Sequence, residues 1–438
     1  MLNWVIATFH RARALLLRSK FARNVTSTFT VQILSLLLAT VNAAVIARLL
    51  GPSGKGILAL TVLVPNVLAL FLSGGISVAN VYYVGQRRFD VATLSSNAMA
   101  FTLMATALGI VVSAGLYSSG FINKALPGIP PGLLALSMLG LPFSLLNNYF
   151  TSILQGMQLI GQVNLVSLTQ RASSVALSLL LVAVLQWGLI GAVLAVLISS
   201  ATAVVILGAM LRRRGASFRP CWNRLVIKTT LKFGLRGYVA NVLQFFNYRL
   251  DLFLVNYFLG TSGAGIYTVS VAMAEMLWYL PNAVGFVIFP KAANTSAAVM
   301  NRFTPRVFRI TLGLTAAGAV VLALIGKPFI DIVYSPAFAS AYLPMLALLP
   351  GVVLLGGGKV LTNEVAGRGY PQYNSIASGV SLLLTIGFDL LLIPRLGVLG
   401  ASIASSIAYT AIFGLALVFY RRVVNRTRPG QMATARTQ

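Results

Sequence analysis

The chain has little charge, a single cysteine and a single histidine. Charged residues make up only 9% of its 438 residues, whereas roughly a quarter is usual in soluble proteins. Cys221 and His10 stand alone, which excludes an internal disulfide bond and metal sites built from several Cys or His ligands. No Walker motif, metal-ligand spacing or nucleophile elbow occurs, so we expect no enzyme, no catalytic residues and no bound metal or cofactor.

Acidic residues are scarce. Six Asp and Glu residues stand against 33 Lys and Arg residues, which gives a net charge of +27. In a soluble protein this excess would suggest nucleic acid as the partner. Here most of the basic residues lie between apolar runs. We therefore attribute them to membrane topology and to contact with anionic lipid, and expect no nucleic-acid partner.

Apolar residues, in contrast, are abundant. They form 58% of the chain, the mean hydropathy is +0.88, and apolar runs of about twenty residues recur from end to end. Such runs must close their backbone hydrogen bonds as helices inside a bilayer. We predict an all-α polytopic membrane protein of about twelve helices, near 27–49, 57–84, 93–117, 131–154, 163–185, 188–211, 233–259, 264–290, 306–327, 340–365, 373–394 and 397–420.

Basic residues alternate between the ends of these spans in the way that predicts cytoplasmic termini. Residues 1–24 form a basic, partly amphipathic segment expected on the cytoplasmic surface, not a cleaved signal. Residues 212–232 form a basic cytoplasmic linker, and residues 421–438 a basic cytoplasmic tail. Between them lie two sets of six spans, at 25–211 and 233–420.

The two sets of spans carry the marks of a duplication. Gly51, Gly54 and Gly56 recur 209 residues later as Gly260, Gly263 and Gly265 (260 − 51 = 209). The same offset relates two further sets of residues, namely Gly188, Gly191 and Ala192 to Gly397, Gly400 and Ala401, and Arg212-Arg213 to Arg421-Arg422. Because six is even, both halves enter the membrane in the same direction. We predict two six-helix bundles related by a pseudo-twofold axis along the membrane normal, the plan of an alternating-access transporter.

Three stretches carry a family resemblance: ARLLGPSGKGILAL from Ala47, RLDLFLVNYFLGTSGAGIYTVSVAMAEMLWYLPNAVGFVIFPK from Arg249, and AGRGYPQYNS from Ala366. The chain resembles the polysaccharide (O-antigen type) flippases of the multidrug/oligosaccharidyl-lipid/polysaccharide exporter superfamily over nearly its whole length. The resemblance implies translocation of undecaprenyl-pyrophosphate-linked oligosaccharide across the bacterial inner membrane. It also implies a V shape around a central cationic cavity. Expected partners are the lipid-linked glycan, membrane lipids, and glycan polymerase and assembly proteins.

Charged residues inside the predicted spans are the candidate site, because a charge at membrane depth costs about 2.5–3.5 kcal/mol on insertion scales. Arg249, Arg171 and Lys359 are the candidate ligands of the pyrophosphate, since Arg donates paired hydrogen bonds to phosphate. Arg171 could instead extend to the inner surface. Lys359 follows Gly356-Gly357-Gly358, which would form either a hinge or a packing surface.

Arg249 and Asp251 lie roughly 200° apart around a helix and cannot pair with each other there. Asp251 shares a polar arc with four residues, Asn241, Gln244, Asn247 and Tyr248. Arg249 lies on a different arc, with Tyr238 and Asn256. We expect one arc to face a cavity and the other a neighbouring helix, and the sequence leaves open which is which.

Carboxylates in the spans would either pair with these cations or bind a coupling ion. Asp251, Glu275 and Glu364 are the candidates, whereas Asp331 and Asp389 are expected nearer the outer edge. We expect a proton or sodium gradient, or the membrane potential, to drive transport. The alternative function is an ion-coupled multidrug antiporter of the same superfamily, which the excess of cations disfavours. A membrane glycosyltransferase is disfavoured because no large outer loop is present.

Overall fold

The computed structural model describes residues 20–426, apart from the side chains of residues 20–29, 236, 237, 240 and 426. Every regular element in this range is a helix. The prediction of an all-α fold is therefore confirmed. Most of the basic segment predicted at 1–24, and the tail from residue 427 onward, lie outside the described residues.

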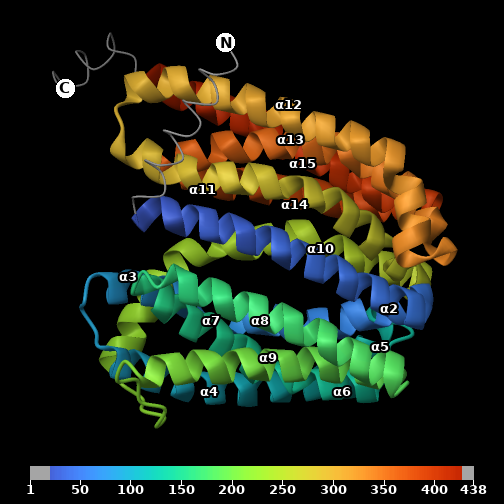
Figure 1. Ribbon diagram of the computed structural model, residues 1–438, viewed down its shortest axis with the longest axis horizontal. Coiled ribbons are helices and arrows are strands. Elements are labelled where there is room, and N and C mark those ends of the chain that lie inside the picture. Colours follow the sequence, from blue (N-terminus) through green and yellow to red (C-terminus); the bar gives the residue numbers. More distant parts are fainter. Residues whose placement is uncertain (1–19, 427–438) are drawn as a thin grey trace, which may run out of the picture. The chain divides into compact units, whose positions relative to one another are not determined.

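Residues 20–212 form nine helical elements (Figure 1). They are α2 (Lys20–Leu72), α3 (Ile76–Gly85), α4 (Val91–Ser118), α5 (Phe121–Ala125), α6 (Pro131–Met138), α7 (Gly140–Gly156), α8 (Ile160–Ser178), the π-helix η1 (Leu179–Val184) and α9 (Gly188–Arg212).

Residues 224–426 form nine further helical elements. They are α10 (Arg224–Glu275), the 3₁₀ turn η2 (Met276–Trp278), α11 (Tyr279–Asn294), α12 (Ala297–Phe329), the π-helix η3 (Ile330–Tyr334), the 3₁₀ helix η4 (Pro336–Ala341), α13 (Tyr342–Gly367), α14 (Gln372–Leu396) and α15 (Val398–Arg426).

The two longest helices each break at a glycine of the duplication. Gly51 in α2 has φ 66° and ψ −174°, and Gly260 in α10 has φ 72° and ψ −175°. Positive φ values of this kind favour glycine because it lacks a Cβ. An unbroken helix of 53 residues would be about 80 Å long, far more than the roughly 30 Å of a hydrocarbon layer. The breaks therefore divide each helix into shorter segments.

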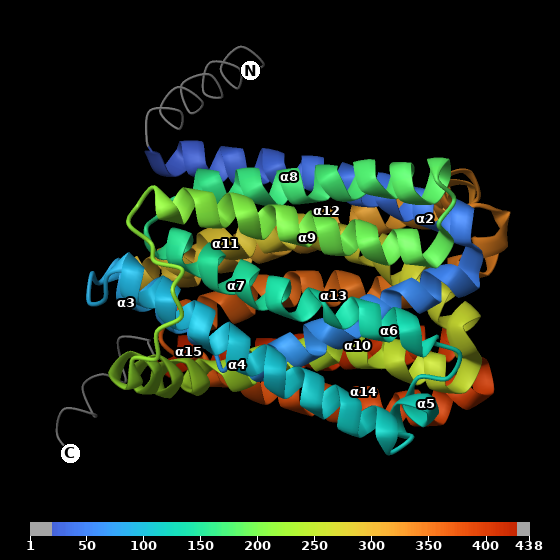
Figure 2. The same cartoon turned by 90° about the horizontal axis from the view of Figure 1, so that it is seen from below.

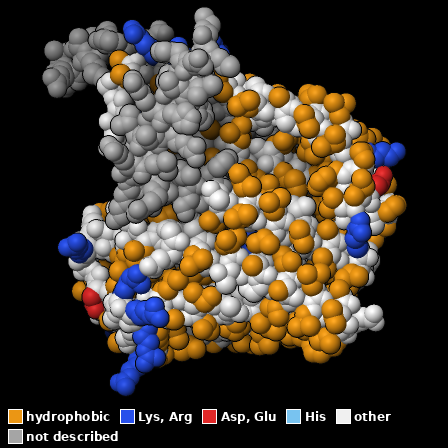
Figure 3. Space-filling view, viewed as in Figure 1, with side chains coloured by type: hydrophobic (Ala, Val, Ile, Leu, Met, Phe, Trp, Pro, Cys, Tyr) orange, Lys and Arg blue, Asp and Glu red, His pale blue; other side chains and the backbone are white. Residues whose placement is uncertain are grey.

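Among the described residues, ten helical segments are long and apolar enough to cross a membrane. Two of them, Thr30–Leu72 and Asn241–Asn294, contain the breaks at Gly51 and Gly260 and exceed the length that one crossing needs. The chain is thus a multi-pass membrane protein, and the total of about twelve crossings stays a prediction. In the face shown in Figure 3, apolar side chains cover most of the described surface, and Lys and Arg gather toward its edges.

The chain folds into two compact units. The N-terminal unit consists of residues 20–43, Pro65–Val111 and Ala135–Arg236, and the C-terminal unit of Ala44–Val64, Val112–Leu134 and 237–426. In the N-terminal unit α7 packs on α3 and α9, and α9 packs on α8. Leu141, Leu145 and Ile153 of α7 and Leu207 of α9 are fully buried there. The apolar face of α7 is therefore the centre of this core.

In the C-terminal unit, α13 packs against α11, α12 and α15, while α14 packs on α15 (Figures 1 and 2). The three glycines before Lys359 lie in the unbroken helix α13. A Cβ at Gly356 would stand 3.1 Å from Pro281, and one at Gly357 would stand 2.9 Å from Phe308. These glycines therefore form a packing surface in this conformation.

The two glycine turns of the duplication meet inside the C-terminal unit. A Cβ at Gly56 would overlap the backbone of Thr261, and a Cβ at Gly265 would overlap the backbone of Pro52. Gly56 and Gly265 are equivalent positions at the offset of 209, and so are Pro52 and Thr261. The contact is reciprocal, which is the pattern of a local twofold axis.

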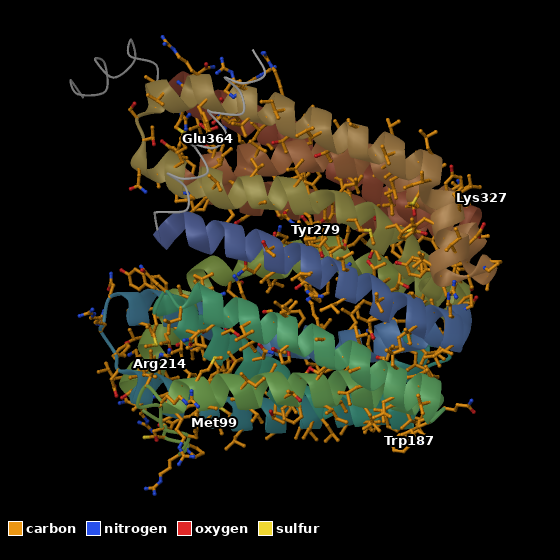
Figure 4. The ribbon with its side chains drawn as sticks, in the orientation of Figure 1. Met99, Trp187, Arg214, Tyr279, Lys327 and Glu364 are labelled. Atoms are coloured by element: carbon orange, nitrogen blue, oxygen red, sulfur yellow. The ribbon has the colours of Figure 1, made fainter. Side chains whose placement is uncertain are left out.

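In each unit, the helices carry labelled polar or aromatic residues at opposite ends (Figure 4). In the N-terminal unit, Trp187 and Arg214 lie at opposite ends. In the C-terminal unit, Glu364 and Lys327 lie at opposite ends. This spacing along the helices is what crossing a bilayer requires of the intervening apolar segments.

Candidate functional site in the C-terminal unit

An ion pair lies within the broken helix α10. Arg249 Nη1 lies 3.4 Å from Glu275 Oε1, and Nη2 lies 3.4 Å from Oε2. The two residues are on opposite sides of the break at Gly260, which lets segments 26 residues apart in sequence approach each other. Their side chains are 39% and 22% exposed. Arg249 therefore reaches a neighbouring helical segment and its charge is compensated there.

Lys359 of α13 lies beside this pair and is held by uncharged groups. Its Nζ donates a hydrogen bond to Asn282 Oδ1 at 2.9 Å and lies 3.9 Å from the ring centroid of Trp278. The Trp278 ring is fixed in turn, because its Nε1 donates to the Val352 carbonyl at 3.0 Å. A cation over a tryptophan face gains a favourable interaction without losing its charge. Lys359 thus has no acidic hydrogen-bond partner among the described residues, and it interacts electrostatically with Glu275.

A cavity of about 300 Å³ opens next to Lys359. Its lining comes from α10, α13, α14 and α15 and consists of Asn241, Gln244, Asn247, Tyr248, Leu355, Lys359, Thr362, Pro371, Asn374, Ala377, Ser378 and Ile412. The arc that the sequence assigned to Asn241, Gln244, Asn247 and Tyr248 is therefore the one that faces a cavity. Arg249, on the other arc, contacts Glu275.

Asp251 lies one turn beyond the cavity-lining arc and is 2% exposed. The Tyr267 hydroxyl donates a hydrogen bond to Asp251 Oδ2, and Ser405 Oγ donates to the same oxygen at 3.1 Å. The Leu252 amide donates to Oδ1 at 2.8 Å. Asp251 is thus a buried carboxylate with hydroxyl partners from two helical segments, and it does not line the cavity.

Asp389 of α14 is a second buried carboxylate, which sequence analysis placed near the outer edge and gave no role. It is fully buried and interacts electrostatically with Asp251 and Tyr267. Neither of its carboxylate oxygens accepts a hydrogen bond from any residue in the described part of the chain. An ionisable residue in an apolar span was the available signal, but its proximity to Asp251 depends on how α14 packs.

Glu364 belongs to a different place in the unit. It forms an ion pair with Arg368 one turn later in the chain, and Arg368 Nη2 also donates to Asn301 Oδ1 at 2.7 Å. Both side chains are buried. Of the two roles expected for Glu364, the structure shows charge pairing, which joins the end of α13 to α12.

Arg171 lies in the N-terminal unit, on α8. Its side chain is exposed and makes no ion pair with any residue from 20 to 426. Its neighbour Gln170 instead joins the helices, because its side chain bonds to Asn147 and Ser200, each at 3.4 Å. Of the three predicted phosphate ligands, the structure brings only Arg249 and Lys359 together in one unit.

Solved structures share this fold over most of the chain. An inward-facing multidrug resistance MATE family transporter of the MOP superfamily aligns with a TM-score of 0.71 and 15% identity, covering 92% of this chain and 98% of that one. The lipid II flippase MurJ, in an inward closed conformation, aligns with a TM-score of 0.74 and 16% identity, covering 91% and 90%. A MOP superfamily transporter from Pyrococcus furiosus, whose binding pocket is described as reversed in polarity, aligns with a TM-score of 0.59 and 16% identity, covering 94% and 98%. At these identities the likeness establishes the fold.

Comparison of the sequence with known proteins identifies the family. An uncharacterized membrane protein of Methanocaldococcus jannaschii is 22% identical over 211 residues, which are 46% of this chain and 41% of that protein. The chain therefore matches less than half the length of that relative. Two of these solved neighbours are transporters and one is a flippase. The polysaccharide biosynthesis protein family matches residues 45–343, more than half of the chain. The chain is thus a multi-pass membrane protein that belongs to the polysaccharide biosynthesis protein family.

Proposed function

We propose that the chain is a flippase that translocates undecaprenyl-pyrophosphate-linked oligosaccharide across the bacterial inner membrane by alternating access. The observation that carries the proposal is the polar cavity beside Lys359, built from membrane-spanning helices of a polysaccharide biosynthesis protein. A lipid-linked glycan needs such a place, because its headgroup must pass the hydrocarbon layer while its tail stays in lipid. The likeness to the lipid II flippase supports the same class of substrate.

The two cations would contribute differently to pyrophosphate binding. Lys359 is held by an amide and an indole ring, so its charge is available to an anion. Arg249 is already paired with Glu275, so an anion must compete with that carboxylate. We assign the first phosphate contact to Lys359. Arg249 would follow once its pair with Glu275 opens, because its planar guanidinium suits phosphate.

Transport would be driven by a proton or sodium gradient. Asp251 and Asp389 are the groups that support this proposal, since they are buried and close enough to interact electrostatically. Carboxylate and hydroxyl oxygens are the ligands that hard cations prefer, and Ser405 and Tyr267 bring hydroxyls to Asp251. A cation bound here would neutralise two carboxylates that otherwise repel each other.

The proposed setting follows from the charge pattern. Both termini are basic and would lie in the cytoplasm, where they contact anionic lipid. The glycan polymerase and assembly proteins that use the flipped glycan would be the protein partners.

Complementation tests the function. Lys359→Ala and Arg249→Ala should each abolish surface glycan in a flippase-deficient bacterial strain, with protein levels close to those of the wild type. Lys327→Ala removes an equivalent charge at the opposite end of the C-terminal unit from Glu364 and should leave export unchanged. Unchanged surface polysaccharide in both site variants would contradict the proposed roles.

The second candidate is a multidrug antiporter, favoured by the likeness to a MATE family transporter. The net positive charge of Lys359 on the cavity wall opposes organic cations. Expression in a drug-sensitive strain separates the two functions. Drug resistance without any glycan export would replace the flippase proposal with this one.

A further inference from the structure

Seven of the twelve residues that line the cavity beside Lys359 have neutral polar side chains. Four side-chain amides, those of Asn241, Gln244, Asn247 and Asn374, line it together with the hydroxyls of Tyr248, Thr362 and Ser378. Within membrane-spanning helices each of these groups is costly unless it has a polar partner. Lys359 is the only charged residue among the described residues that line the cavity.

Two of the amides are fixed in orientation. Asn247 Nδ2 donates to the Ser378 carbonyl at 2.6 Å, and Asn374 Nδ2 donates to the Thr362 carbonyl at 3.2 Å. A carbonyl oxygen can only accept, so each amide must present its nitrogen to it. The oxygen of each amide is consequently left as an acceptor. Asn247 is 1% exposed, and its Oδ1 accepts no hydrogen bond from any residue in the described range.

The exposed amides come from α10. Asn241 and Gln244 lie one turn apart on α10 and are exposed, and the closest bond of Gln244 is a long one of 3.4 Å to the Tyr248 hydroxyl. An amide offers both donors and an acceptor. A ligand in the cavity would thus meet donors and acceptors a few ångströms apart, beside an aromatic ring.

This chemistry selects among ligands. Acceptor oxygens repel a phosphate, which has only acceptors at its surface when ionised, and Lys359 repels an organic cation. A sugar suits the wall better, because each hydroxyl donates and accepts at once. The volume of about 300 Å³ is at the lower end of ligand pockets, which suits one sugar residue better than a whole headgroup.

We propose that this cavity is a sugar-binding subsite, in which Asn241, Gln244 and Asn374 select an uncharged sugar next to the pyrophosphate, while Lys359 marks the boundary with the phosphate. The inference rests on the proposed flippase function for its biological substrate. It adds to that function a division of roles, in which the amides set the identity of the sugar and the cation binds the part common to all lipid-linked glycans.

Export of paired glycans tests the division. The cells would make two lipid-linked glycans that share the polyprenyl pyrophosphate and differ only in the uncharged sugar attached to it. Asn241→Ala, Gln244→Ala and Asn374→Ala should each lower the export of one glycan about threefold to tenfold more than that of the other, the loss expected for one hydrogen bond. Lys359→Ala should lower both equally.

Asn294→Ala is the matched control, because that amide is exposed on α11 and donates to the carbonyl of Pro290 in its own helix. It should change neither export rate. Equal losses for both glycans in the three amide variants, or no loss in any of them, would overturn the sugar subsite.

Binding to the purified full-length chain in lipid nanodiscs separates this inference from the flippase function. The probes are the methyl glycosides of the two sugars and inorganic pyrophosphate, measured by calorimetry. One glycoside should bind to the wild type and bind about threefold to tenfold more weakly to Asn374→Ala, whereas pyrophosphate binding should be weakened by Lys359→Ala and unchanged by Asn374→Ala. Glycoside binding without glycan export would reject the flippase and keep the subsite. Absence of glycoside binding together with absence of selective export would reject the subsite.

Discussion

The two halves of the duplication share their glycine turns but differ at five charged positions inside the spans of the second half. Gly51 and Gly260 break their helices with nearly the same torsion angles, and Gly56 and Gly265 make the same contact from opposite sides. The charged residues Arg249, Asp251, Glu275, Lys359 and Asp389 of the second half correspond, at the offset of 209, to Thr40, Asn42, Asn66, Phe150 and Leu180 of the first. None of the five counterparts is ionisable.

The difference separates what backbone geometry requires from what chemistry requires. The positive φ and the close backbone approach restrict both copies to glycine, whereas nothing in the helix geometry requires a charge at the other positions. Charge in a membrane-spanning helix is costly, so its retention in one half only indicates a role that is not symmetric. We therefore expect the second half to perform the ion and anion chemistry.

The largest effect is expected from removing this asymmetry at Asp251. Asp251→Asn gives the second half the residue found at the equivalent Asn42. If the carboxylate binds the coupling cation, transport should fall more than about a hundredfold while the folded protein persists, because the amide keeps the shape but loses the charge. Glycan export and size-exclusion profiles would be measured together. Export within twofold of the wild type would remove Asp251 from the coupling site.

The next effect concerns what the two halves share. Gly56→Ala and Gly265→Ala should destabilise the protein by similar amounts, about 1–3 kcal/mol or more, because each Cβ overlaps the facing backbone. Gly115→Ala is the control, since an added Cβ there meets open space. Thermal melts followed by fluorescence-detected chromatography would show the three values. A loss in only one of the two variants would mean that the contact is not reciprocal.

A smaller effect is expected at the Arg249–Glu275 pair. Arg249→Thr copies the equivalent Thr40 and leaves Glu275 without its partner. Breaking a fully buried pair costs about 3–5 kcal/mol, and the 39% exposure of Arg249 lowers our expectation to about 1–2 kcal/mol. Adding Glu275→Asn should restore most of the stability. A double-mutant cycle on melting temperature measures the coupling, and additive losses would show that the pair contributes nothing.

The smallest effect is expected from the ring under Lys359. Trp278→Phe keeps an aromatic face but weakens its attraction for the Nζ, which lies 3.9 Å from the ring centroid. The expected cost is about 0.5–1 kcal/mol, which corresponds to a twofold to fivefold change in pyrophosphate affinity. Calorimetry with pyrophosphate would detect it. If Trp278→Phe weakened pyrophosphate binding more than Lys359→Ala, Lys359 would not be the residue that binds the anion.

The sequence was sufficient for features that depend on local rules. The repeated glycines mark both helix breaks, and the helical wheel separated Arg249 from Asp251. The alternation of apolar and basic segments was enough to predict a multi-pass helical protein.

Features that depend on packing were not accessible from the sequence. The proximity of Asp389 to Asp251 requires α14 to lie against the segments that hold Tyr267 and Ser405. The support of Lys359 by Asn282 and Trp278 requires η2 to turn the chain between α10 and α11. Neither relation has a fixed sequence spacing. The choice between hinge and packing at Gly356–Gly358 was also a question about neighbouring helices.

The reciprocal contact of Gly56 and Gly265 has a consequence for how the two copies diverged. Every substitution of glycine adds at least a Cβ, and here that atom meets backbone in the other copy. A second mutation changes a side chain and cannot remove backbone atoms, so no substitution in the facing segment could relieve this overlap. Phe150 and Lys359, which also occupy equivalent positions, differ, whereas Gly56 and Gly265 are the same residue. The repeat can therefore still be recognised in the sequence at Gly56 and Gly265, where no second mutation could compensate for the first.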